Sequence, residues 1–150
     1  YQQAMEMVMI RLARTRRSYR SNQFELVFGY TSGIDLIGHI TYNDPYLQDQ
    51  AYSETNDLVG DLLSDLGSDD TLVLVSDHGL QDGIHTKQAM IASTEPHIVR
   101  AVDSVLDVRE ALEEELTNGD HKPALAEVRR KSSVSNENQV QEHLEDLGYI

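Results

Sequence analysis

Two apolar runs of the chain end in turns that carry acids and histidines, and they suggest the architecture. Residues 72–75 are Leu-Val-Leu-Val and lead directly into Ser-Asp-His-Gly at 76–79. Residues 24–30, Phe-Glu-Leu-Val-Phe-Gly-Tyr, form a similar run before a Thr-Ser-Gly turn. Short runs rich in β-branched residues and bounded by turn signals are typical of strands buried on both faces. We therefore expect strands at 24–30 and 71–76.

Helical patterns precede, separate and follow these strands. Residues 2–19 carry an apolar stripe at helical spacing, and Asn43-Asp44-Pro45 is a start signal for a second helix that ends near Leu66. A strand–helix–strand order with so long a crossover predicts a right-handed unit and a parallel strand pair. Shorter elements are expected as a strand at 88–92 and helices at 95–102, 107–116 and 139–147. The predicted fold class is α/β, with a parallel-rich sheet flanked by helices.

The domain organisation is predicted from the segment in which the apolar periodicity is lost. Residues 117–138 are polar and contain Asn-Gly, Pro and Ser-Ser, which predicts a linker or excursion. We assign 1–116 to part of an α/β catalytic domain and 139–150 to a C-terminal amphipathic helix. Because the chain opens inside an apparent helix, we expect that the N-terminal strands of the domain precede Tyr1.

Charge restricts the partners. The net charge is −14, divided into +4 over residues 1–20 and −18 over the remainder. So acidic a surface repels nucleic-acid backbone and anionic lipid, and no apolar run approaches the ~18 residues of a membrane span. The basic first helix is either an RNA-binding arm or, as we favour, a solvated or acid-paired helix face. The acidic surface with few Lys suits a high-salt cytoplasm, so we expect a halophilic, cytoplasmic protein.

Histidines and aspartates supply the candidate chemistry. Cysteine is absent, so any transition-metal site must use imidazole and carboxylate. His39, His78 and His85 all follow predicted strands, and Asp35 lies one helical turn before His39. A lone Asp/His pair is more often a surface hydrogen bond, but two such sets after two strands favour a metal site. The other three histidines, in helical or polar segments, are not expected to be ligands: His97, His121 and His143.

Three motifs in order resemble the alkaline phosphatase superfamily. They are Asp35-x-x-Gly38-His39, Ser76-Asp77-His78-Gly79 and Gly83-x-His85-Thr86. The nearest-looking members are type I phosphodiesterases/nucleotide pyrophosphatases, with sulfatases and cofactor-independent phosphoglycerate mutases more distant. The ending at 144–150 is similar to that of many sulfatase-like chains. The resemblance covers about 24–116 and this tail, and implies the C-terminal portion of an alkaline-phosphatase-like fold.

Carried over by residue, the resemblance implies two divalent metal ions, zinc or manganese. Asp35, His39 and His85 match the ligands of the first metal, although His85 follows His78 more closely than in many relatives. Asp77 and His78 match two ligands of the second metal. The family's second site also uses an earlier Asp and a Thr or Ser nucleophile, which we expect upstream of Tyr1.

The function implied by the resemblance is metal-dependent hydrolysis of phosphodiester, nucleotide pyrophosphate or related phosphoester bonds. Two metals about 4 Å apart can stabilise both the attacking and the leaving oxygen of an in-line displacement. The expected partners are a small phosphorylated substrate and the N-terminal part of the same protein, without which we expect no activity. The alternatives are a phosphomutase or sulfatase of the same superfamily, or a non-catalytic metal-binding or assembly remnant.

Overall fold

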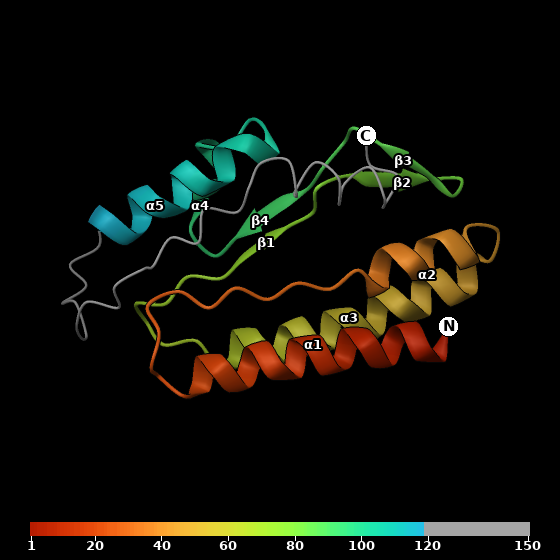
Figure 1. The fold of residues 1–150 in the computed structure, drawn as a ribbon, viewed down its shortest axis with the longest axis horizontal. Helices are drawn as coiled ribbons and strands as arrows, with labels where there is room; N and C mark the ends of the chain where they lie inside the picture. The colour runs from red at the N-terminus through yellow and green to blue at the C-terminus, as the bar shows by residue number, and fades with distance from the viewer. Residues whose placement is uncertain (119–150) are drawn as a thin grey trace, which may run out of the picture.

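The computed structural model describes residues 1–118, which form a helical layer, two small sheets and a second group of helices (Figure 1). The helical layer consists of α1 (Gln2–Arg20), α2 (Gly33–Thr41) and α3 (Pro45–Asp65). The strands are β1 (Val73–Val75), β2 (Gly79–Gln81), β3 (Ile84–Thr86) and β4 (Ile91–Ser93). The second group consists of α4 (Pro96–Arg100), the 3-10 turn η1 (Val105–Asp107) and α5 (Val108–Asn118).

Local signals place the long helices where the sequence predicts them. Asp44 is the N-cap of α3, its side chain accepts a hydrogen bond from the Leu47 N–H at 3.1 Å, and Pro45 begins the helix. The main core lies where α1, α2 and α3 meet, and its buried members are Ala4, Met5, Ile37 and Ala51. Thr41, also buried on α2, donates its hydroxyl to the carbonyl of Ile37 at 2.7 Å. The apolar faces of these helices therefore fix which face of α2 points outward.

Ion pairs join α1 to α3, which run in the same direction (Figure 1). Asp65 accepts hydrogen bonds from Arg16 and from Arg20, and Arg16 also pairs with Asp61. These bonds, first from Arg16 and then from Arg20, hold the pKa of the Asp65 carboxyl well below its ordinary value. The hydroxyl of Tyr19 donates to Asp70 at 2.5 Å, which raises the pKa of the phenol. The basic end of α1 is thus partly neutralised by acids of this chain.

Both sheets in the part of the chain that the structure describes are antiparallel. Strand β1 pairs with β4, with Val75 opposite Ile91, and β2 pairs with β3 in a hairpin. Bonds from Ser76 N to Met90 O at 2.9 Å and from Thr94 N to Leu72 O at 3.0 Å extend the first ladder. The expected strand at 88–92 therefore exists, slightly later in the chain, and its antiparallel partner is β1.

The expected parallel pair is not present within residues 1–118. Residues 24–30 are not assigned to a strand, and no backbone hydrogen bond of the described chain joins them to β1. The segment lies against α1, where a Cβ on Gly29 would come within 2.2 Å of the Thr15 hydroxyl oxygen. Phe28 is 85% exposed, whereas a strand buried on both faces needs neighbours and covering layers on each side. The fold is therefore mixed α/β, and the parallel-rich sheet is not found in the residues described.

The C-terminal elements agree in type with the expected ones. Helix α4 falls within the expected 95–102, and Ser104 caps the turn that leads into α5, with Asp107 accepting from the Ser104 N–H at 2.8 Å. Helix α5 extends through Asn118, two residues into the expected linker. The rest of that linker and the expected helix at 139–147 lie outside the described residues, so the domain division stays a prediction. Within residues 1–118, no helix is long and apolar enough to span a membrane.

Candidate metal centre

Helix α2 positions the first two candidate ligands. Asp35 lies in its first turn, where the helix dipole favours a carboxylate, and His39 lies one turn later. This spacing brings His39 Nε2 within 3.4 Å of Asp35 Oδ1. The opposite face of α2 is fixed by burial of Ile37, which is 2% exposed. Packing of α2 on the other helices therefore directs Asp35 and His39 away from the core.

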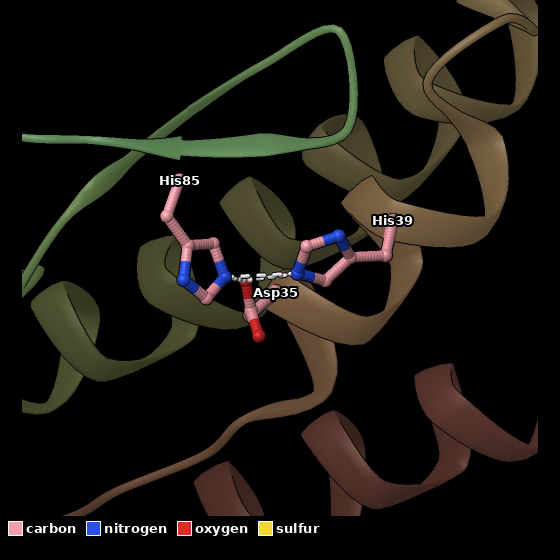
Figure 2. A group of neighbouring side chains, drawn as sticks. All are labelled: Asp35, His39 and His85. Carbon is pink, nitrogen blue, oxygen red and sulfur yellow. Dashed lines mark hydrogen bonds and ion pairs between the residues drawn. The ribbon is translucent and has the colours of Figure 1, made fainter. Parts of the chain in front are cut away.

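The β2–β3 hairpin supplies His85. Its register places His85 opposite Leu80, and the two-residue connection Asp82-Gly83 has positive φ at both positions, +53° and +76°. Such turns match the twist of the strands they join, and Asp-Gly is among their preferred sequences. His85 Nε2 thereby lies 3.1 Å from Asp35 Oδ1 and 2.8 Å from His39 Nε2 (Figure 2). The hairpin was not among the expected elements, although Asp82-Gly83 was the signal that could have revealed it.

His78 lies beside this group. Its ring stacks on that of His85, with centroids 3.8 Å apart and planes 25° apart. His78 Nε2 is 3.9 Å from Asp35 Oδ1 and 3.7 Å from Asp77 Oδ1. The side chain of Asp77 is 71% exposed, so it marks the solvent side of the group. The five candidate ligands therefore share one surface, with Asp77 at its edge.

The donor atoms of Asp35, His39 and His85 suit a small divalent cation. One ligand atom from each residue lies within 4.8 Å of the other two, and the interatomic distances above are 2.8, 3.1 and 3.4 Å. Ligand bonds of about 2.05 Å at tetrahedral angles give a donor–donor distance of roughly 3.3 Å. Two imidazoles and a carboxylate form a donor set accepted by zinc, and imidazole and carboxylate also occur around manganese. The side chains are 33–42% exposed, so the group is open to a ligand from solvent.

The remaining histidines lie elsewhere. His97 on α4 contacts Glu115 at 2.7 Å and Glu95 at 3.7 Å, and it does not belong to the Asp/His group. His121 and His143 lie outside the residues that the structure describes. That the Asp/His group binds metal stays a prediction, which its geometry supports.

Comparison with known proteins identifies the family. The sequence profile of type I phosphodiesterase / nucleotide pyrophosphatase matches residues 3–147, nearly the whole chain. The chain therefore belongs to this family, a member of the alkaline phosphatase superfamily, and the resemblance seen in the three motifs is confirmed. Comparisons with curated proteins and with solved structures gave no match.

Proposed function

We propose that this protein contributes a divalent-metal site to the hydrolysis of phosphodiester, nucleotide pyrophosphate or related phosphoester bonds. Membership of the family supports phosphoester hydrolysis in general. The observation that carries the more specific proposal is the triangle of donor atoms on Asp35, His39 and His85. The substrate class that fits is a small phosphorylated molecule, because the acidic chain repels nucleic-acid backbone.

Each residue has a defined task in this proposal. Asp35 contributes the negative charge of the first site, and His39 and His85 contribute neutral nitrogen donors through Nε2. Asp77 and His78 would hold a second cation, for which they form only part of a ligand set. When bound, zinc or manganese ions would supply Lewis acidity for the attacking and leaving oxygens of an in-line displacement. We propose that an earlier Asp ligand of the second site and a Thr or Ser nucleophile are supplied by residues upstream of Tyr1.

The segment 24–30 supports the proposed contribution of further chain. It exposes three large aromatic side chains, Phe24, Phe28 and Tyr30, by 62%, 85% and 63%. Exposed apolar surface beside an extended, unpaired backbone is typical of a place where another strand adds. We propose that the N-terminal part of the domain adds there and completes the parallel-rich sheet. We further propose that the acidic surface reflects a high-salt cytoplasm.

Calorimetric titration with zinc and with manganese tests the metal site. We expect saturable binding by the wild type and by the control His97→Ala, which removes an exposed, acid-paired histidine away from the group. His85→Ala should weaken binding at the first site by about 100-fold. Equal binding by His85→Ala and wild type would contradict the assignment.

Hydrolysis of bis-p-nitrophenyl phosphate tests the rest of the proposal. We expect residues 1–150 alone to give no metal-dependent turnover, because groups that act together in catalysis are not replaceable singly. Turnover that His78→Ala abolishes would instead place the nucleophile within this chain, or assign attack to water, and the proposal of an external nucleophile would be wrong.

A further inference from the structure

The hairpin that carries His85 also contacts His39, through the carbonyl of Gly83. We propose that the Asp82-Gly83 turn is a positioning element, whose Gly83 carbonyl fixes the tautomer of His39 so that Nε2 faces Asp35 and His85 without a proton. The importance of this tautomer for metal binding rests on the function proposed above. The tautomer itself is a property of the metal-free protein.

The hydrogen bonds determine where the protons lie. His39 Nδ1 is 3.0 Å from Gly83 O, and a carbonyl oxygen only accepts, so Nδ1 carries the hydrogen of the neutral ring. His39 Nε2 is then an acceptor. His85 Nε2 faces this nitrogen at 2.8 Å and the Asp35 carboxylate at 3.1 Å, so His85 Nε2 must be the donor. The two histidines therefore hold opposite tautomers in the metal-free protein.

In this arrangement, His39 and His85 differ in whether Nε2 is ready to bind a cation. His39 already presents a lone pair to the centre, as metal-binding histidines do when a carbonyl holds their other nitrogen. His85 presents a proton, which must leave Nε2 before that nitrogen can bind a cation. The proton moves to His85 Nδ1 through solvent, so no net proton is released. Cation binding should consequently switch the tautomer of His85 and leave that of His39 unchanged.

Two close approaches hold the turn against α2. Gly83 has φ +76°, and a Cβ there would lie 3.1 Å from Cδ1 of Tyr42. On the same hairpin, Leu80 packs so closely on α2 that a Cβ on Gly38 would lie 2.3 Å from its Cδ2. Glycine is needed at position 83 both for the backbone conformation and for the Tyr42 contact. A side chain at 83 should therefore shift the carbonyl that His39 uses.

The test is two-bond ¹H–¹⁵N correlation of the histidine rings in metal-free protein at mildly alkaline pH. We expect wild-type His39 as the Nδ1–H tautomer and His85 as the Nε2–H tautomer. Gly83→Ala should convert His39 to a mixture and weaken zinc binding about 10–100-fold, the usual effect of losing an outer partner of a histidine ligand. Gly83→Asn should disturb the His39 tautomer and the zinc affinity less than Gly83→Ala does, because Asn tolerates positive φ, although its Cβ meets Tyr42 in the same way.

Gly60→Ala is the matched control. A Cβ at Gly60 on α3 meets no atom of the described residues within 4 Å, so this variant should keep both tautomers and the zinc affinity of the wild type. If Gly83→Ala does not fold, Leu80→Ala loosens the same hairpin without straining the turn, and should also mix the His39 tautomers.

Three results would overturn the proposal: wild-type His39 as the Nε2–H tautomer, folded Gly83→Ala with unchanged tautomer and affinity, or a His85 tautomer that zinc does not switch. Absence of zinc binding by the wild type contradicts the proposed function instead. In that case the metal-free spectra still decide whether the Gly83 carbonyl orients His39.

Discussion

Two clusters of polar side chains on this protein differ in how their charges are balanced. Between α1 and α3, cationic Arg16 and Arg20 share the carboxylate of Asp65, so opposite charges neutralise one another. Between α2 and the β2–β3 hairpin, imidazoles gather around Asp35, and two ring nitrogens approach to 2.8 Å. The first cluster is complete in itself. The second brings a carboxylate and two imidazoles to one point on the surface, an arrangement that a cation would stabilise once His85 Nε2 has lost its proton.

The clusters also differ in how they are built. The first uses side chains four residues apart on each of two long helices, Arg16 and Arg20 against Asp61 and Asp65. The second depends on one short helix and one two-residue turn. We therefore expect substitutions in the first cluster to change stability, and substitutions in the second to change ligand binding.

The largest expected effect is on zinc binding by Asp35→Ala. Asp35 is the only carboxylate in the three-residue donor group, so its removal should weaken zinc binding by more than about 100-fold, beyond the 10–100-fold typical of outer partners. The metal-free melting temperature should change less than the zinc affinity does, because Asp35 lies outside the core that α1, α2 and α3 form. Calorimetry and a thermal scan measure the two. Binding within threefold of wild type would mean that Asp35 is not a ligand.

The converse substitution is Asp65→Ala. It leaves Arg16 and Arg20 beside each other without the carboxylate they share, and should lower the melting temperature by several degrees with zinc affinity unchanged. Asp61→Ala is the control, because among the described residues Asp61 pairs with Arg16 and not with Arg20, and its side chain is 57% exposed. A smaller fall for Asp65→Ala than for Asp61→Ala would show that the shared carboxylate is not the centre of the cluster.

Acid should weaken the first cluster selectively. The folded-state pKa of Asp65 is lowered from its ordinary 3.8, so its contribution to stability is complete above that value and is lost as the pH falls below it. The wild type should therefore lose more stability than Asp65→Asn as the pH falls from about 5 toward 2. Denaturant unfolding at several pH values measures this difference. Parallel pH profiles for the two proteins would contradict the assignment of the lowered pKa.

Added salt should have the smallest effect on the melting temperature. Its sign distinguishes the contribution of close ion pairs from that of repulsion among the many acidic residues. Residues 21–150 carry −18, and their mutual repulsion opposes the compact state. At molar ionic strength the range of that repulsion shortens to about 3 Å, so potassium chloride should raise the melting temperature. Close ion pairs such as Arg16–Asp65 are weakened less. A melting temperature that stays flat or falls between about 0.1 M and about 2 M salt would count against a halophilic protein.

The sequence alone determined the features that depend on neighbours along the chain. Helical spacing placed α1 and α3, the Asp44-Pro45 signal placed the start of α3, and Asp35 and His39 fell on one face of α2 because they are four residues apart. The three ordered motifs were sufficient to predict the family, which the profile match confirms.

Only the tertiary structure decided the features that depend on distant residues. His85 meets Asp35 across 50 residues and His39 across 46, and the Gly83 carbonyl reaches His39 across 44. Strand β1 pairs antiparallel with β4, while the apolar segment 24–30 has no strand partner within residues 1–118. Periodicity reports which face of an element is buried, but not which element covers it. The element that covers a face is decided by hydrogen-bond register and by close packing, such as that of Gly38 and Gly83 on their neighbours. Both involve atoms far apart in the sequence, so periodicity does not reveal them.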